Sequence, residues 1–467
     1  MTATVDRPIE PQEHIEAPLT LEEPPPRVLG WWDQIGLWGN LGLSILGPVT
    51  AIFILQPATG GQMSYVAAAL AIIVGTILGT LMVAAAAVPG AQTGAPSMVL
   101  LRGLFGRRLS YLPTLVNVVQ LIGWSVFEIV VISAAAEQLL PWKGHRWPYV
   151  VVAGVLTTLM AIRPLGVVRI LRRYAIAAVT IATIYLYVEL LQNPMPSLTH
   201  GSWTGFWPGA DYAIAAAVSF APLASDYTRH ARSSRSAFGG TMIGYTIAQS
   251  ASYILGLLAI ATVVKASDAA DTTAMFGAFI AVPAGWLAMG VLVARELDQS
   301  FADSYSTVMS VQNVFPRFDR RILAVVVGGV ATVLALALQI NDYANFLTLL
   351  GSVFVPLTAC LLVDYFRRRR GEWNITDNAP SRPALLVPWI AGIVTYQLIN
   401  PGYVGWWVDR WTTVQGWLHF TPQSWMSASV LSFAVAALLT LPFTFARARD
   451  LSDPPAAIAP SPSDKSK

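Results

Sequence analysis

The sequence predicts an all-α polytopic membrane protein with twelve transmembrane helices, arranged as two five-helix repeats of inverted topology. Three observations support this fold class. Of the 467 residues, 55% are hydrophobic and only 12% are charged, whereas soluble proteins carry about 25% charged residues. Apolar runs of about 20 residues, long enough to cross a bilayer, recur along the chain. Two of these runs, five runs apart, are interrupted by Gly and Pro, as in membrane proteins built from inverted repeats.

The expected spans follow one another with short connections. Spans one to five form the first repeat (about 31–191), spans six to ten form the second (about 208–366), and two accessory helices follow (about 382–446). The apolar segment 267–282 is too short to cross and is expected to be an extracellular surface or re-entrant helix. The segments 1–29 and 448–467 are expected to be disordered tails around the transmembrane domain 30–447. The twelve predicted spans are 31–56, 64–88, 111–140, 147–165, 172–191, 208–228, 237–264, 284–314, 321–340, 342–366, 382–399 and 424–446.

The positions of Lys and Arg predict the orientation of the chain. The even-numbered connections and the two termini hold 24 of the 29 Lys and Arg residues, and Arg295 lies within a span. Because cytoplasmic loops are enriched in Lys and Arg, both termini are expected in the cytoplasm, with the chain in the cytoplasmic membrane. The residues in odd-numbered connections are Lys143, Arg146, Lys265 and Arg410.

The first and sixth spans are expected to be broken. The first contains GNLG (Gly39–Gly42) and GP (Gly47–Pro48), and the sixth contains SFAP (Ser219–Pro222). Pro222 removes a helix hydrogen bond and disfavours helical geometry at Ala221. Gly and Pro are common in membrane helices, so either interruption alone is weak evidence. Their five-span offset predicts that unwound backbone and helix ends meet at one site in mid-membrane.

The third span carries the first candidate binding residues. Within residues 121–136, Trp124 and Glu128 lie one helical turn apart on the same face. A carboxylate in mid-membrane costs about 2.5–3.5 kcal/mol to insert, so it usually has a partner or a function. A Trp on a membrane helix is more often a packing residue, but a ring beside a hydrogen-bonding group suits a flat polar ligand.

The eighth span is the most polar. The stretches RELDQS (Arg295–Ser300) and DSYS (Asp303–Ser306) lie in a run that is otherwise apolar. In two five-span repeats, span eight is the counterpart of span three. We therefore expect Asp298, Gln299 and Asp303 to face Trp124 and Glu128 across the pseudo-symmetry axis. Asp298 could instead have only a structural role, by pairing with Arg295.

Other classes of function find less support. The five His residues lie outside the interior of the predicted spans, and no His, Asp and Glu cluster has metal-ligand spacing, which disfavours a membrane enzyme. No phosphate-binding loop supports ATP-driven pumping. Single, unequal carboxylates differ from the repeated rings of a channel filter. A receptor-like sensor on the same fold stays open. The single Cys360 excludes an internal disulfide, and no cofactor is expected.

Six motifs of this chain resemble those of a known family. They are LWGN (Leu37–Asn40), GAQTGAPSMVLLRGLFG (Gly90–Gly106), GWSVFE (Gly123–Glu128), FAPLASDYTRHARS (Phe220–Ser233), FADSYSTVMSVQN (Phe301–Asn313) and FLTLLGSVFVPLTACLLVDYF (Phe346–Phe366). From about residue 32 to 445 the chain resembles the nucleobase–cation symporters, in particular purine/cytosine permease-like members and their hydantoin and allantoin transporter relatives. The resemblance implies a leucine-transporter-type five-plus-five inverted-repeat fold and secondary active uptake of a small heterocycle, driven by sodium ions or protons.

The resemblance also implies roles for single residues. Trp124 is similar to the Trp that stacks on the substrate ring, and Glu128 stands where relatives often have Gln or Asn at the ring's edge. Phe220 would cover the opposite ring face, and Asp303 stands where relatives commonly have an Asn that binds the substrate. The implied substrate-binding residues are Trp124, Glu128, Ser219, Phe220, Gln299, Asp303 and Asn40.

The coupling ion stays open between a proton and sodium. In a sodium-coupled relative, span eight supplies a backbone carbonyl and then two hydroxyls as cation ligands. The corresponding carbonyl here is that of Ala294, but the hydroxyl positions hold Leu297 and Asp298. An acidic residue there could ligate sodium or carry a proton, and buried carboxylates favour the proton. The candidate coupling residues are Asp298, Ala294, Glu128 and Gly39. If the coupling ion is sodium and not a proton, it is expected to bind near Ala294 and Asp298.

The acidic groups also bear on the substrate. As acceptors, Glu128 and Asp303 predict a ring with several N–H donors, as in cytosine, other aminopyrimidines or purines. Hydantoin, allantoin, uracil or a thiamine-precursor pyrimidine are alternatives within the family. An amino-acid permease of the same fold is less favoured, because Phe220 is bulky and acidic groups would repel a carboxylate. The expected partners are the heterocycle, the cation and the bilayer, without nucleic acid; the oligomeric state is left open.

Overall fold

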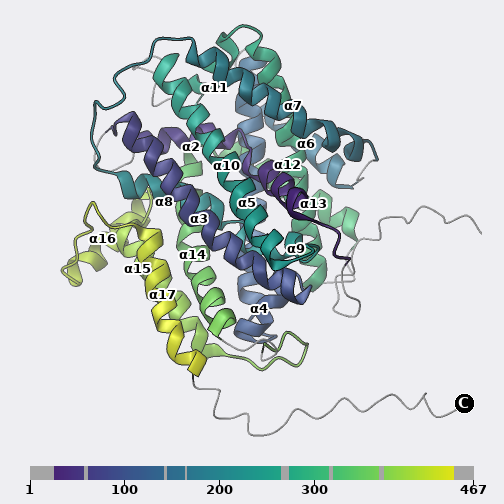
Figure 1. Cartoon of the computed structure of the whole chain (residues 1–467), viewed down its shortest axis with the longest axis vertical. Helices are drawn as coiled ribbons and strands as arrows, with labels where there is room; N and C mark the ends of the chain where they lie inside the picture. Colours follow the sequence, from purple (N-terminus) through teal and green to yellow (C-terminus); the bar gives the residue numbers. More distant parts are fainter. Residues whose placement is uncertain are drawn as a thin grey trace, which may run out of the picture.

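The computed structural model describes residues 26–56, 62–140, 145–162, 166–264, 273–314, 319–367 and 373–445. Within these ranges the chain is helical apart from connections and two isolated β-bridges, Leu29–Ala231 and Met63–Ser202. The helices pack into one bundle (Figure 1). They are α1 (Trp31–Gly42), α2 (Leu46–Leu55), α3 (Tyr65–Thr93), α4 (Ser97–Phe105), α5 (Tyr111–Leu139), α6 (Trp147–Ile162), α7 (Gly166–Leu191), α8 (Phe206–Val218), η1 (Ala221–Leu223), α9 (Ala224–Thr228), α10 (Ser234–Thr262), α11 (Ala274–Ala281), α12 (Gly285–Val314), α13 (Arg320–Ala337), η3 (Ile340–Asp342), α14 (Tyr343–Arg367), η4 (Pro383–Leu385), α15 (Leu386–Ile399), α16 (Gly405–Trp417) and α17 (Ala428–Phe445).

The lengths of the helices fit a polytopic membrane protein. In the described part of the chain, four helices are long and apolar enough to cross a bilayer, namely α3, α5, α10 and α14 extended back to Ile340. The pair α1 and α2 passes the same test as one span bent by 64°. Shorter apolar helices include α6, α15 and α17. The count of twelve spans therefore remains a prediction.

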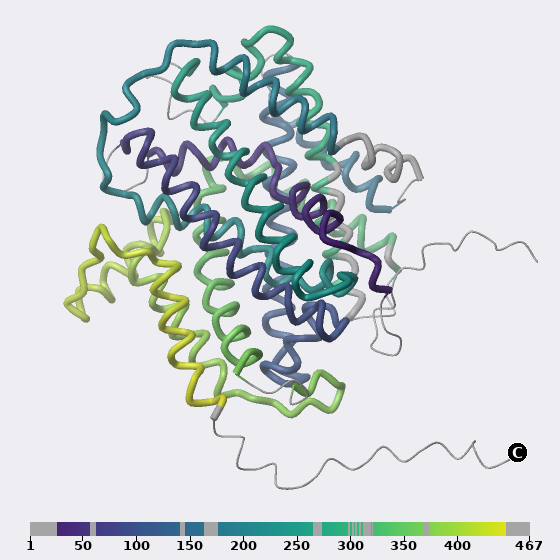
Figure 2. The backbone as a smooth tube through the Cα atoms, in the orientation of Figure 1, coloured from purple at the N-terminus to yellow at the C-terminus, as the bar shows by residue number. Residues whose placement is uncertain are grey.

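The first span is broken where α1 ends at Gly42 and α2 begins at Leu46. Figure 2 follows the chain through this bend, in purple. The break lies between the two glycine-containing stretches that predicted it. The end of α1 and the start of α2 both pack closely against α10. A Cβ at Gly42 would lie 2.8 Å from the Cβ of Ala248, and one at Gly47 would lie 2.1 Å from the Oγ of Ser252. The small residues thus allow a close approach that a side chain would prevent.

The sixth span is broken at the predicted place. The helix α8 ends at Val218, and after Ser219 and Phe220 the chain forms the short 3₁₀ helix η1 before α9. Pro222 lies in the first turn of η1, where its missing N–H is not needed. Because α2 packs against α8, the two broken spans lie together in the bundle.

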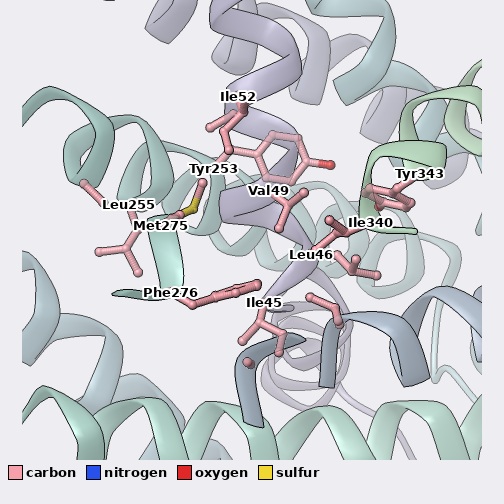
Figure 3. Close-up of a cluster of buried hydrophobic side chains, with 14 of the residues drawn as sticks. Ile45, Leu46, Val49, Ile52, Tyr253, Leu255, Met275, Phe276, Ile340 and Tyr343 are labelled. Atoms are coloured by element: carbon pink, nitrogen blue, oxygen red, sulfur yellow. The ribbon is translucent and has the colours of Figure 1, made fainter. Parts of the chain in front are cut away.

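The largest apolar cluster surrounds α2. Figure 3 shows Ile45, Leu46, Val49 and Ile52 from this segment with Tyr253 and Leu255 of α10, Met275 and Phe276 of α11, and Ile340 and Tyr343. Val49, Met275 and Phe276 are completely buried. Burying a large apolar side chain stabilises a protein by about 1.5–3 kcal/mol when water is the alternative. The short α11, which contributes Met275 and Phe276 to this cluster, lies within the apolar segment that the sequence predicted to be a surface or re-entrant helix.

The last helices of the described chain, α15 and α17, pack beside α14. Figure 1 shows α15 and α17 next to α14 on one side of the bundle. The carboxylate of Asp211, in α8, is buried and accepts hydrogen bonds from the Ser427 hydroxyl (2.5 Å) and from the amides of Ala428 (2.8 Å) and Ser429 (3.1 Å). It therefore caps the N-terminus of α17 and fixes this accessory helix to the broken sixth span.

Three features differ from the expected organisation or lie outside it. The helices α4 and α16 were not predicted. Residues 26–29, expected to belong to a disordered tail, are placed against the loop after α9, where the Leu29 amide donates to the carbonyl of His230 (3.0 Å) and the Arg232 amide donates to that of Leu29 (2.8 Å). Most of the two expected tails, 1–25 and 446–467, and residues 267–272 of the short apolar segment lie outside the described residues.

Candidate functional site

A small pocket of about 30 Å³ lies where the two broken spans meet α5, α10, α12 and α14. Both breaks reach it, because Ser44 from the first and Phe220 from the sixth contribute to its wall. Its lining residues are Leu41, Gly42, Ser44, Leu46, Gly47, Trp124, Glu128, Ala216, Phe220, Tyr245, Gln249, Tyr253, Gln299 and Tyr343.

Aromatic rings line the pocket from two sides. Trp124 of α5 packs edge-to-face on Phe346 (ring centroids 5.3 Å apart) and on Tyr343 (5.9 Å). Phe220 packs edge-to-face on Tyr245, at 5.4 Å. Edge-to-face neighbours fix the orientation of a ring. The arrangement supplies two separately anchored aromatic side chains around one cavity.

Two buried oxygen atoms in the pocket wall have no hydrogen-bond donor among the described residues. They are Oε2 of Glu128 and Oε1 of Gln249, and each side chain is only 1% exposed. The amide of Gln249 is held in place, since its Nε2 donates to the Thr76 hydroxyl (3.0 Å) and to the Ala213 carbonyl (2.9 Å). A buried acceptor without a donor costs about 1–3 kcal/mol, so both atoms are suited to accept N–H groups from a ligand.

Asp303 of α12 lies beside Glu128. The two carboxyl groups are close enough to hydrogen-bond to each other. An ionised carboxylate can only accept a hydrogen bond, whereas a protonated one can also donate. A hydrogen bond between two carboxyl groups therefore needs one proton held between them.

Arg295 and Glu296, also on α12, contact the break in the first span. The buried guanidinium of Arg295 donates to the backbone carbonyl of Asn40 (2.5 Å), to its side-chain oxygen (3.2 Å) and to Gln299 (2.5 Å). The carboxylate of Glu296, which is 0% exposed, accepts from the Ser44 hydroxyl (2.6 Å) and from the Ile45 amide (3.3 Å). Adjacent residues of one helix thus hold the two ends of a broken helix.

The structure brings several of the predicted site residues together. Four of them line the pocket, namely Trp124, Glu128, Phe220 and Gln299. Asp303 does not line it but lies next to Glu128, which does. This agreement concerns position, and their roles in binding remain proposals.

Other predicted residues lie elsewhere. Ser219 is buried with its hydroxyl bonded to the Ala216 carbonyl (2.7 Å). Asn40 faces Arg295, and Gly39 approaches the carbonyl of Gly244, 3.8 Å from where a Cβ would lie. Ala294 is exposed. The side chain of Asp298 lies outside the described residues.

Sequence reasoning missed Gln249 and did not single out Glu296. Both had a signal, since each is a polar residue inside an apolar span, which is a functional pointer in itself.

Comparisons with known proteins decide the family. A family model described as "Permease for cytosine/purines, uracil, thiamine, allantoin" matches residues 26–383. The match contains both broken spans and every residue that lines the pocket. The chain belongs to this permease family. It is therefore a secondary transporter of nucleobase-like substrates and not an enzyme, as the motifs implied.

Curated relatives in this permease family are distant. The cytosine permease of Escherichia coli (strain K12) is 24% identical over 364 residues, which cover 76% of this chain and 83% of the relative. The vitamin B6 transporter TPN1 of Saccharomyces cerevisiae is 25% identical over 369 residues, covering 71% of this chain and 60% of the relative.

Solved structures establish the fold of this permease. The inward-facing conformation of Mhp1 superimposes with a TM-score of 0.70 over 96% of both chains, at 15% identity. Mhp1 in a closed conformation with bromovinylhydantoin bound gives 0.67, over 91% of this chain and 95% of that one, also at 15% identity. MhsT in complex with L-phenylalanine gives 0.53, over 88% and 97%, at 15% identity. The predicted all-helical, polytopic, leucine-transporter-like fold is confirmed.

Proposed function

We propose that this permease imports a cytosine-like aminopyrimidine or a purine, together with a cation, by alternating access. The observation that carries the proposal is the pocket itself, where the aromatic residues Trp124 and Phe220 lie around the unpaired acceptors of Glu128 and Gln249. A flat ring can stack on the aromatic side chains while its edge meets the polar ones.

The polarity of the free acceptors favours one kind of ring. Both Oε2 of Glu128 and Oε1 of Gln249 need N–H groups. Cytosine and adenine each carry an exocyclic amino group beside a ring nitrogen. Uracil and hydantoin have no exocyclic amino group, and each has two carbonyl oxygens where cytosine has one and adenine none. These oxygens would be repelled by the acceptor oxygens of Glu128 and Gln249.

The pair of Glu128 and Asp303 supports proton coupling. A proton shared between two buried carboxyl groups can be taken up on one side of the membrane and released on the other when access alternates. Sodium remains the alternative coupling ion. We also propose that both termini lie in the cytoplasm, as the Lys and Arg distribution predicts, so that transport with the proton gradient is inward.

A second candidate substrate class is supported by the relatives. The family description includes uracil, thiamine and allantoin, TPN1 is a vitamin B6 transporter, and Mhp1 was solved with a hydantoin. All of these are small heterocycles whose rings can stack on the same aromatic side chains. An amino acid, as bound by MhsT, fits less well, because its carboxylate would face the carboxyl groups of Glu128 and Asp303.

A thermal-shift screen of the purified full-length protein tests the proposal. The panel comprises cytosine, adenine, guanine, uracil, hydantoin, allantoin, a thiamine-precursor aminopyrimidine, pyridoxine and phenylalanine. We expect an amino-substituted ring to raise the melting temperature most, because a ligand that binds only the folded state stabilises it. Counterflow of the best ligand in proteoliposomes then separates transport from sensing. Stabilisation by phenylalanine alone, or by no heterocycle, would reject the proposal.

A further inference from the structure

Arg295 lies where a helix end needs a positive charge. The carbonyl of Asn40 is among the last four of α1, which have no partner within the helix. The guanidinium of Arg295 donates to this carbonyl at 2.5 Å and to the Asn40 side chain at 3.2 Å. The C-terminal end of a helix carries a partial negative charge that cations stabilise, more strongly when the site is buried.

Glu296 provides the opposite charge at the other end of the break. It accepts a hydrogen bond from the amide of Ile45, the residue that precedes α2, and a second one from Ser44. The N-terminal end of a helix carries a partial positive charge that anions stabilise. Arg295 and Glu296 together therefore neutralise both helix ends and contribute no net charge of their own.

The same arginine contacts the wall of the substrate pocket. Its Nη2 donates to Gln299, which lines that pocket, and Ser44, the partner of Glu296, lines it as well. Arg295 and Glu296 also line a second small cavity, of about 20 Å³, beside the break. The position of Arg295 couples the geometry of the first break to that of the substrate pocket.

We propose that Arg295 is a cation built into this permease, which holds the carbonyl end of α1 so that substrate binding needs no sodium ion there. A free cation at this place would lie beside a buried guanidinium and would be repelled by it. The inference deepens the proposed function, because it concerns the same pocket. It assigns to Arg295 the positive charge at this helix end, where the sequence predicted a coupling cation near Ala294 and Asp298.

The test removes the built-in cation and offers a free one. In Arg295→Ser the guanidinium is lost, and the adjoining cavity has room for a small cation. The melting temperature of the full-length protein is measured without substrate in sodium chloride, in choline chloride and with a few millimolar guanidinium chloride, at equal ionic strength. Arg295→Lys keeps a cation at the same place. Arg146→Ser is the matched control, since Arg146 also donates to a carbonyl, that of Ala335 (2.8 Å), away from the pocket.

We expect the melting temperatures of the wild type and of Arg295→Lys to differ by less than about 1 °C between sodium and choline, because no ion is bound at the break. Arg295→Ser is expected to melt lower in choline and to recover by about 3 °C or more with sodium or guanidinium. Arg146→Ser is expected to show no recovery. Stabilisation of the wild type by sodium, or an Arg295→Ser protein that neither ion stabilises, would overturn the inference.

The measurement is independent of the substrate proposal. It uses sodium, choline and guanidinium as probes and needs no ligand, so a failed heterocycle screen leaves it intact. If Arg295→Ser does not fold, the wild type and Arg295→Lys still decide, because a sodium-dependent melting temperature in either contradicts a built-in cation. Once a substrate is known, its affinity for Arg295→Ser in choline is expected to fall about tenfold or more, with partial recovery in guanidinium.

Discussion

The carboxyl groups of Glu128 on α5 and Asp303 on α12 share a hydrogen bond in the interior of the bundle. They come from the third and eighth predicted spans, which are counterparts in the predicted five-plus-five repeat. The pairing joins α5 to α12 beside the pocket, because Glu128 also lines its wall. A proton held at this contact lies beside the proposed substrate pocket.

The first prediction concerns this shared proton. Glu128→Gln keeps a hydrogen-bonding side chain of the same shape but cannot release a proton. We expect it to retain counterflow, in which no net proton movement is needed, and to lose accumulation driven by an imposed pH gradient. Both are measured in proteoliposomes without sodium. Accumulation that follows a sodium gradient and ignores the pH gradient in the wild type would assign the coupling to sodium.

The second prediction concerns stacking on Trp124. Base–aromatic stacking is worth about 1–3 kcal/mol per ring. Trp124→Ala should therefore weaken substrate binding by roughly 5- to 150-fold and abolish uptake at low substrate concentration, while expression and the melting temperature change little. Trp417→Ala is the control, because Trp417 is 75% exposed in α16. An unchanged affinity in Trp124→Ala would make Trp124 a packing residue.

The third prediction concerns the edge of the ring. In competition for uptake, cytosine is expected to exceed uracil by about tenfold or more, since leaving a buried acceptor without a donor costs about 1–3 kcal/mol. Glu128→Gln should reduce this preference, because an amide can donate to the carbonyl of uracil as well as accept. Competition assays on both proteins measure the ratio. If uracil or hydantoin competes better than every amino-substituted ring, the assignment of the acceptors fails.

Much of the fold could be predicted because it depends on local sequence. The apolar runs predicted most helices, and Pro222 predicted the break after Phe220, since its ring and missing N–H act on the residues next to it. The first break was predicted less well. The glycines on both sides of it allow close packing, but the groups that hold its ends open are Arg295 and Glu296, from a distant part of the chain.

The site could be predicted only in part, because it too depends on contacts between distant parts of the chain. Trp124 and Glu128 share a helix face, so their spacing already indicated a common site. The register of α12 was harder to infer, because every polar residue in Arg295–Ser300 is costly to bury and sequence alone does not say which ones meet a partner. The structure buries Arg295 and Glu296 against the break and leaves Ala294 exposed. Gln249 could have been found as an isolated amide in an apolar span.

A further relationship ties the end of α14 to the helix α4. The guanidinium of Arg382 donates to both oxygens of Asp364, at 2.7 and 2.8 Å, and to the carbonyl of Gly103 at 2.9 Å. Trp373 donates to the same carboxylate, at 2.8 Å. The side chain of Asp364 is completely buried, and that of Arg382 is 11% exposed. This paired, two-pronged geometry is strong, and a single-point cation such as Lys cannot reproduce it.

The last prediction follows from this burial. Arg382→Ala should destabilise the protein by about 3–5 kcal/mol, because it leaves a buried carboxylate without its counter-charge. Arg102→Ala is the matched control, since Arg102 pairs at 2.8 Å with Asp377, whose side chain is 67% exposed, and exposed pairs contribute about 0–1 kcal/mol. Reversible unfolding in detergent, compared across the two variants and the wild type, measures the difference. Arg382→Lys should fall between them, because it restores the charge but only one hydrogen bond at a time. Equal losses for Arg382→Ala and Arg102→Ala would show that the buried pair does not hold α4 to α14.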